Sequence, residues 1–144
     1  MIEKQTEVFY IFLSVQSKKR EVVAFLKELK DLLGQDNFDT NTDMILIRKK
    51  KQGKDQIYST PYTMLDLDYD IDDVIARLKE LKLEEYSETK IDRDDVNPPL
   101  LFVFGKGINN KLVYVKLKIK GDHRKRILCV SFHYAKESMT FLYA

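Results

Sequence analysis

Cysteine and histidine are scarce in this chain of 144 residues, which has one cysteine, Cys129, and two histidines. A single cysteine cannot form an internal disulfide, and no group of cysteines and histidines has the spacing of a zinc site. We therefore expect Cys129 to be a small buried residue in a reducing compartment. The sequence predicts neither a bound metal nor a cofactor.

Long apolar runs are also missing. The longest covers residues 8–13, which is too short to span a bilayer, and the residues before it lack the basic region of a secretory signal. We expect a cytoplasmic protein whose ligands include neither a membrane nor a dinucleotide. The length and the 44% of hydrophobic residues predict one domain over residues 1–144.

Charge is unevenly distributed, although the net charge is only +2. Residues 66–95 carry twelve acids and five bases, whereas residues 101–136 carry nine bases and one acid. A basic surface of this kind can attract an anionic ligand such as RNA. Solubility, or an acidic protein partner, explains the same pattern.

Two amphipathic helices are predicted. Apolar residues between positions 18 and 34 recur with helical spacing, and Gly34 is a suitable terminator. A second helix should begin near Asp70, whose side chain can cap the free amides of the first turn. Its buried stripe should consist of Val74, Ile75, Leu78 and Leu81. Residues 7–15 have the composition of a strand or of the start of a buried helix.

The C-terminal third predicts three strands. Apolar and β-branched residues occupy positions 100–104, 112–120 and 125–132, with turns expected at 105–110 and 121–124. They should form an antiparallel meander. The predicted fold class is α+β, with a small antiparallel sheet packed against two or more helices.

One strand carries a polar stripe. Tyr114, Lys116, Lys118 and Lys120 alternate with apolar residues and should share one face. Such a face suits RNA, but a solvated sheet edge rich in lysine is the simpler interpretation.

The pairing of the last two strands determines what surrounds this stripe. If Lys120 pairs with Lys125, then Tyr114 faces Ser131 and Lys116 faces Cys129, with His133 diagonal to Tyr114. In that register Tyr114, Lys116, Ser131 and His133 share a face. A slip of one residue would bring Phe132 there instead.

Four segments in order carry a family resemblance. They are residues 65–86, LLFVFGK at 100–106, VYVKLKIK at 113–120 and CVSFHYAK at 129–136. The series resembles the motility quorum-sensing regulator (MqsR) family of bacterial toxins over about residues 62–136, with residues 1–17 as an additional N-terminal strand. The resemblance implies a RelE-like fold, cleavage of mRNA, and inhibition by a cognate antitoxin protein.

The resemblance also implies roles for individual residues. Tyr114 and Lys116 match the family's tyrosine-x-lysine strand motif, and His133 stands where a better-known member has lysine. These three are the expected catalytic residues of a metal-independent endoribonuclease, in which the 2′-hydroxyl attacks the adjacent phosphate. The expected RNA-binding residues are Lys90, Lys106, Lys118, Lys120, Arg124 and Arg126.

Two positions depart from the family. Ser87 follows Tyr86 where the family has a lysine, so Lys90 or Lys106 would have to replace it, and Val103 or a neighbour stands where the family has glutamine. A non-catalytic module that binds RNA or protein through the same face is the alternative, and a purely protein-binding regulator is a third. The simplest interpretation of the two residues themselves is that Tyr114 covers the sheet and that His133 is a surface or packing residue.

Overall fold

A computed structural model describes residues 14–144 of the chain. Its elements are α2 (Lys19–Leu33), β1 (Met44–Leu46), the 3₁₀ helix η1 (Gly53–Tyr58), α3 (Thr60–Leu67), α4 (Ile71–Lys79), the 3₁₀ helix η2 (Leu83–Glu85), β2 (Tyr86–Lys90), β3 (Leu101–Ile108), β4 (Lys111–Lys120) and β5 (Arg126–Tyr134). The strand or helix predicted at residues 7–15 lies almost entirely outside the described residues. Within them, Val15 forms an isolated antiparallel bridge with Thr89.

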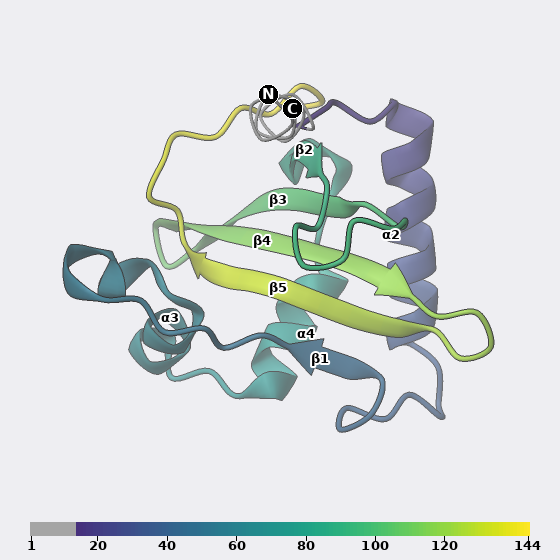
Figure 1. The fold of residues 1–144 in the computed structure, drawn as a ribbon, viewed down its shortest axis with the longest axis horizontal. Helices are drawn as coiled ribbons and strands as arrows, with labels where there is room; N and C mark the ends of the chain where they lie inside the picture. Colours follow the sequence, from purple (N-terminus) through teal and green to yellow (C-terminus); the bar gives the residue numbers. More distant parts are fainter. Residues whose placement is uncertain (1–13) are drawn as a thin grey trace, which may run out of the picture.

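The five strands form one mixed sheet in the order β1-β5-β4-β3-β2 (Figure 1). Strands β3, β4 and β5 form the predicted antiparallel meander, and β2 adds to it antiparallel to β3. The prediction of a purely antiparallel sheet is wrong, because β1 pairs with β5 in parallel. The α+β class is confirmed.

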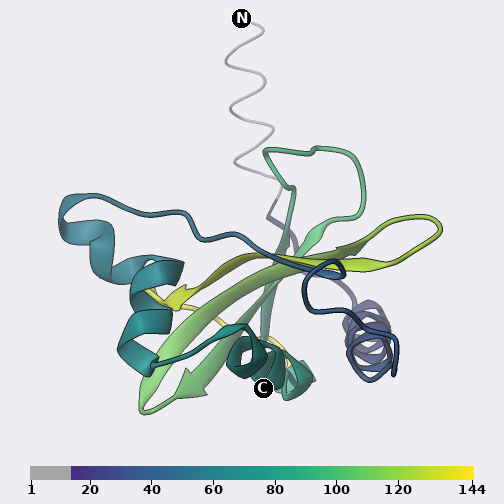
Figure 2. The same ribbon diagram turned by 90° about the horizontal axis from the view of Figure 1, so that it is seen from below.

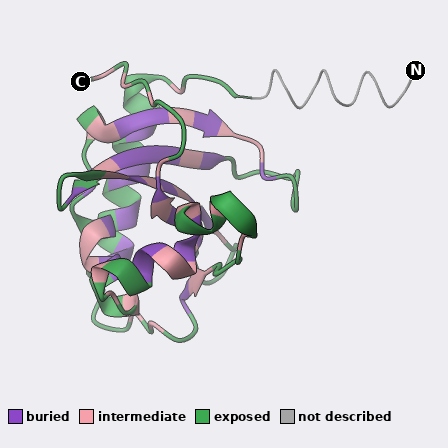
Figure 3. Ribbon diagram, turned by 90° about the vertical axis from the view of Figure 1, so that its left-hand side faces the viewer, coloured by how far each residue is buried: buried purple, intermediate pink, exposed green. Residues whose placement is uncertain are grey.

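The two faces of the sheet are covered differently. Helices α2 and α4 lie against one face, whereas the loop between β2 and β3 and the segment after β1 lie on the other (Figure 2). Figure 3 shows the strands largely buried and the helices striped with buried and exposed residues. The hydrophobic core lies between the sheet and its helices, which leaves the opposite face available for a site.

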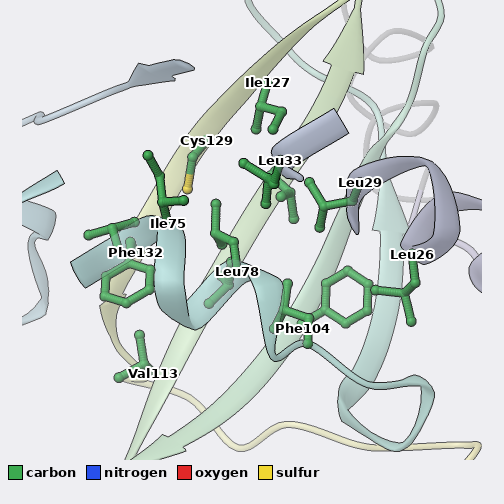
Figure 4. Close-up of a cluster of buried hydrophobic side chains, with 14 of the residues drawn as sticks. Leu26, Leu29, Leu33, Ile75, Leu78, Phe104, Val113, Ile127, Cys129 and Phe132 are labelled. Atoms are coloured by element: carbon green, nitrogen blue, oxygen red, sulfur yellow. The ribbon is translucent and has the colours of Figure 1, made fainter. Parts of the chain in front are cut away.

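Both predicted helices are present. Val74, Ile75 and Leu78 are buried in α4 as predicted, but the helix ends at Lys79, so Leu81 is buried just beyond it. Val22, Phe25, Leu26, Leu29, Leu32 and Leu33 of α2 are buried. In α4, Asp70 accepts a hydrogen bond from the amide of Asp73, and the Asp73 carboxylate accepts one from the amide of Asp70. Leu26, Leu29 and Leu33 meet Ile75, Leu78 and the strand side chains Phe104, Val113, Ile127 and Phe132 in one cluster (Figure 4). Cys129 is buried in the same cluster, as predicted.

Helix α3 was not predicted. It supplies hydrogen-bond partners to the part of the β5 edge that β1 does not pair with. The amide of Phe132 donates to the Thr60 hydroxyl at 3.1 Å, and the amide of Tyr134 donates to the Thr63 hydroxyl at 2.9 Å. Two threonines one helical turn apart thus satisfy alternate amides of the strand beyond the point where β1 ends. Buried amides need such partners.

The first hairpin turn is shorter than predicted. Only Asn109 and Asn110 form it, and both have positive φ, as a two-residue turn between twisted strands requires. Gly105 lies inside β3 instead of in the turn, and a Cβ atom there would lie 2.7 Å from the ring of Phe141. The C-terminal segment therefore packs directly on the sheet at this glycine.

The pairing of β4 with β5 differs from the predicted register. Lys120 pairs with Arg126, Lys116 with Ser131 and Tyr114 with His133. A β-bulge between Lys116 and Leu117 adds one residue to β5. The turn shifts the register by one residue, and the bulge shifts it by one more. Because side chains alternate between faces, a total shift of two residues returns them to the predicted face. The partners were wrong, but the shared face of Tyr114, Lys116, Ser131 and His133 is confirmed.

No helix among residues 14–144 has the length and apolar character needed to cross a membrane.

Candidate functional site

The sheet face opposite the helices contains a hollow of about 820 Å³. Its floor is formed by Tyr114 and Lys116 of β4 with Ser131 and His133 of β5. Three segments form its walls: residues 47–51 after β1, residues 91–94 after β2, and residues 136–140 after β5. We call this hollow the basin.

Positive charge predominates in the basin. Six cationic side chains line it against four carboxylates, which gives a formal charge of +2 with His133 neutral. The cations are Lys49, Lys51, Lys90, Arg93, Lys116 and Lys136, and the acids are Glu88, Asp92, Asp94 and Glu137. A partly enclosed concave surface of this sign attracts anions.

Tyr114 and His133 form a stacked pair on the floor. Their ring centroids are 5.2 Å apart and their planes meet at 15°. The ammonium of Lys116 lies 5.9 Å from the centroid of the Tyr114 ring. The alternation of β4 and the pairing with β5 thus place three chemically active groups side by side.

The histidine is held in one tautomer. Its Nδ1 lies 2.9 Å from the backbone oxygen of Tyr134, and since a carbonyl oxygen only accepts, Nδ1 carries the hydrogen. In the neutral ring, Nε2 is then the free base. Burial lowers the pKa of His133, and the charges of Lys51 and Lys116 lower it further, against the backbone hydrogen bond to Tyr134. The imidazole is therefore neutral at pH 7.

The pKa values of the three neighbouring groups, Tyr114, Lys116 and Lys90, are shifted as well. Burial raises the pKa of Tyr114, with Lys90 opposing the shift, so the phenol keeps its proton. Burial lowers the pKa of Lys116, and the charge of Lys90 lowers it further. Burial also opposes the charge on Lys90, but Tyr114 and Glu88 outweigh it, and the pKa of Lys90 is raised. Lys90 Nζ lies 3.1 Å from Glu88 Oε1.

Lys90 and Lys106, the two lysines expected to replace the one absent at position 87, lie on opposite faces of the sheet. Lys90 is on the basin face next to Tyr114. Lys106 is on the helix-covered face and pairs with Glu85 at 3.3 Å and Glu80 at 3.6 Å. The expectation that Lys106 contacts RNA is therefore not supported by its position.

Lys118 is also not placed to contact RNA as predicted. Its side chain is 0% exposed, and its Nζ lies 3.0 Å from Asp92 Oδ2 and 3.5 Å from Asp95 Oδ2. Its place in the polar stripe predicted contact with RNA, but the loop after β2 covers it. Lys118 anchors that wall of the basin instead.

The remaining expected RNA-binding residues lie elsewhere on the sheet. Lys120, Arg124 and Arg126 line a second hollow at the far end of β4 and β5. Arg124 forms a two-pronged ion pair with the buried carboxylate of Asp43, with both N–O distances 2.6 Å. Arg124 is therefore already engaged in holding the strand β1, whereas Arg126 is exposed.

Part of the basin wall was not predicted from the sequence. Lys49, Lys51, Arg93 and Lys136 line the basin and were not among the expected site residues. The run of four basic residues at 48–51 was a usable signal, but nothing in the sequence placed this segment beside β5. Among residues 14–144, no group of three or more His, Cys, Asp and Glu side chains is arranged to hold a metal ion.

Comparisons with models of known protein families, with curated proteins and with solved structures give no significant match to this chain. The basin offers a neutral imidazole with a free Nε2, a protonated phenol, and ammonium groups beside both, which together can move protons and stabilise an anion.

Proposed function

We propose that this protein is a metal-independent endoribonuclease of the toxin type, which cleaves mRNA in the basin. The observation that carries the proposal is the stack of His133 on Tyr114 beside Lys90 and Lys116. A half-buried neutral base with ammonium groups nearby provides the side chains needed for attack by a 2′-hydroxyl on its own phosphate.

Each group has a role in the reaction. Nε2 of His133 takes the proton of the 2′-hydroxyl, whose oxygen attacks phosphorus. The P–O5′ bond breaks, and Lys116, whose pKa is lowered, supplies the proton to the departing O5′. The products are a 2′,3′-cyclic phosphate and a 5′-hydroxyl. Lys90 and the phenol of Tyr114 bind the phosphate oxygens and stabilise their charge in the transition state.

The family assignment is part of the same proposal. We propose that the chain is a member of the MqsR family, which its ordered series of segments resembles. Membership implies a RelE-like fold, inhibition by a cognate antitoxin and a cytoplasmic location. Lys90 takes the place of the lysine that is absent at Ser87, because it reaches Tyr114 on the basin face.

A cleavage assay with matched histidine variants tests the proposal. Purified protein incubated with mRNA in EDTA should give discrete cuts, which disappear in Tyr114→Phe, Lys116→Ala and His133→Ala. His123→Ala is the control, because His123 is exposed in the β4–β5 turn. Uncut RNA from folded wild-type protein, free of any antitoxin, would refute the enzyme.

A non-catalytic RNA-binding module is the second candidate. It is favoured by the departures at Ser87 and Val103, since Val103 is fully buried and offers no polar group to the basin. This candidate predicts salt-dependent RNA binding with no cleavage.

A further inference from the structure

The segment after β1 forms one wall of the basin. It runs without a helical turn from β1 to η1, along the β5 edge and on the side of the sheet opposite α2 and α4 (Figures 1 and 2). Ile47, Lys49 and Lys51 line the basin, whereas Arg48 and Lys50 do not. This alternation is that of an extended chain, in which every second side chain points the same way.

Both ends of this wall are fixed. At its start, the amide of Ile47 donates to the Cys129 carbonyl at 2.9 Å. At its end, Lys51 Nζ donates to the Tyr58 carbonyl at 2.8 Å, and Asp55 of η1 pairs with Lys136 at 2.8 Å. The wall is thus attached to β5 at one end and to the segment after β5 at the other.

The wall faces the reactive pair across the basin. Lys51 lies close enough to His133 and Lys116 for its charge to act on both. Lys49 is exposed, and Lys51 is half-buried. Two residues of an extended chain advance about 6.7 Å, which is comparable to the length of one extended nucleotide.

We propose that residues 47–51 are a second RNA-binding element, in which Lys49 and Lys51 hold successive phosphates of a single strand beside the stacked pair. This inference rests on the proposed function for its choice of ligand. It assigns the substrate as single-stranded RNA, because a hollow of about 820 Å³ admits a nucleotide or two but not a duplex. Ile47, at 38% exposed, provides an apolar surface for a base on the same wall.

The segment supplies its own matched control. The double variant Lys49→Ala/Lys51→Ala removes two charges that face the basin, and Arg48→Ala/Lys50→Ala removes two charges from the same segment that do not. The probe is a short 2′-O-methyl oligoribonucleotide, which binds but lacks the attacking hydroxyl. Its dissociation constant is measured at several salt concentrations, so binding is read independently of cleavage.

The expected result is a difference in salt dependence. For a single strand, the slope of log K against log[salt] falls by about 0.7 for each phosphate that the protein no longer neutralises, so the basin-facing double should show a slope smaller by about 1.4. The outward-facing double should keep the wild-type slope. Equal slopes in the two doubles would overturn the second RNA-binding element, whatever the cleavage assay shows.

Single variants, combined with the cleavage assay, distinguish failure of this RNA-binding element from failure of the proposed enzyme. Because Lys51 also donates to the Tyr58 carbonyl, the single variants Lys49→Ala and Lys50→Ala repeat the comparison without disturbing that bond. Binding that depends on Lys49 without cleavage of ordinary RNA supports this element and refutes the enzyme. Cleavage with equal binding by the two single variants refutes this element alone, and absence of single-strand binding by the wild type refutes both.

Discussion

Tyr114 and His133 face each other across β4 and β5, with ring centroids 5.2 Å apart and planes within 15°. The stack covers the imidazole on one side, and the Tyr134 carbonyl accepts from its Nδ1. A histidine held in this way presents one basic nitrogen, Nε2, in one direction. The pairing of two strands therefore prepares the base before any substrate binds.

The first prediction concerns the titration of His133. Burial and the charges of Lys51 and Lys116 hold its pKa below the ordinary 6.5. Because the protonated form is disfavoured in the fold, protonation of His133 costs stability only as the pH falls below 6.5. NMR titration of His123→Gln, which leaves one histidine, should give a value below 6.5. The value should rise in Lys51→Ala, and no change in that variant would contradict the assigned charge effect.

The second prediction concerns the buried Lys118. Lys118→Met removes the cation from between Asp92 and Asp95 and leaves Asp92, 6% exposed, without its partner. We expect a loss of roughly 3 kcal/mol in the free energy of unfolding, measured by urea titration, because a buried charge is left uncompensated.

Two controls accompany that measurement. Adding Asp92→Asn to Lys118→Met should recover part of the loss, since it removes the stranded charge. Lys120→Met, at a partly exposed position of the same strand, should change the stability by no more than about 0.5 kcal/mol. A loss in Lys120→Met as large as in Lys118→Met would show that the ion pair is not the cause.

The third prediction tests how α3 completes the edge of β5. Thr60→Val and Thr63→Val keep the shape of the side chain but remove the acceptor for the amides of Phe132 and Tyr134. Each should cost about 1–3 kcal/mol, because a buried donor is left unsatisfied. Hydrogen exchange at these two amides should accelerate. The exposed Thr42 provides the control, and Thr42→Val should leave both amides protected.

The fourth prediction concerns acid stability. Arg124 holds the pKa of Asp43 down to about 2, against an ordinary 3.8. A carboxyl with a lowered folded pKa contributes stability above pH 3.8, and this contribution is lost as the pH falls from 3.8 to 2. Arg124→Ala should therefore flatten the loss of stability in that window, which urea titrations at several pH values measure. An unchanged pH dependence in this variant would contradict the ion pair as its cause.

The RNA affinity of the same variant is informative as well. Because Arg124 is engaged with Asp43, we expect Arg124→Ala to weaken RNA binding at neutral pH no more than Arg126→Ala, a change in the same second hollow outside the basin. A strong loss of affinity confined to Arg124→Ala would show that it contacts RNA directly.

The sequence predicts those parts of this fold that depend on local patterns. The stripes of α2 and α4, the cap at Asp70 and the three meander strands all follow from spacing within one segment. Helix α3 and the parallel strand β1 do not, because contacts distant in sequence stabilise them. Strand β1 is only three residues long, and its partner lies some 80 residues further along the chain.

In the site, too, local patterns predict some residues, and contacts distant in sequence determine the others. Alternation in β4 places Tyr114 and Lys116 on one face. The shift at the turn and the bulge in β5 compensate each other, so His133 stays on that face as predicted. Alternation alone also predicted an exposed Lys118, which the loop after β2 buries. Lys51 reaches the basin from a segment whose path depends on tertiary structure, so its role becomes visible only in the fold.

The decisive measurement follows the chemistry of a single cut. An oligoribonucleotide that the protein cuts at one site is compared, in EDTA, with the same molecule carrying a 2′-O-methyl group at the nucleotide 5′ to the cut. We predict cleavage of the first to a 2′,3′-cyclic phosphate and a 5′-hydroxyl, and none of the second. Equal cleavage of both, or products with a 5′-phosphate, would contradict attack by the 2′-hydroxyl and the roles assigned to His133 and Lys116.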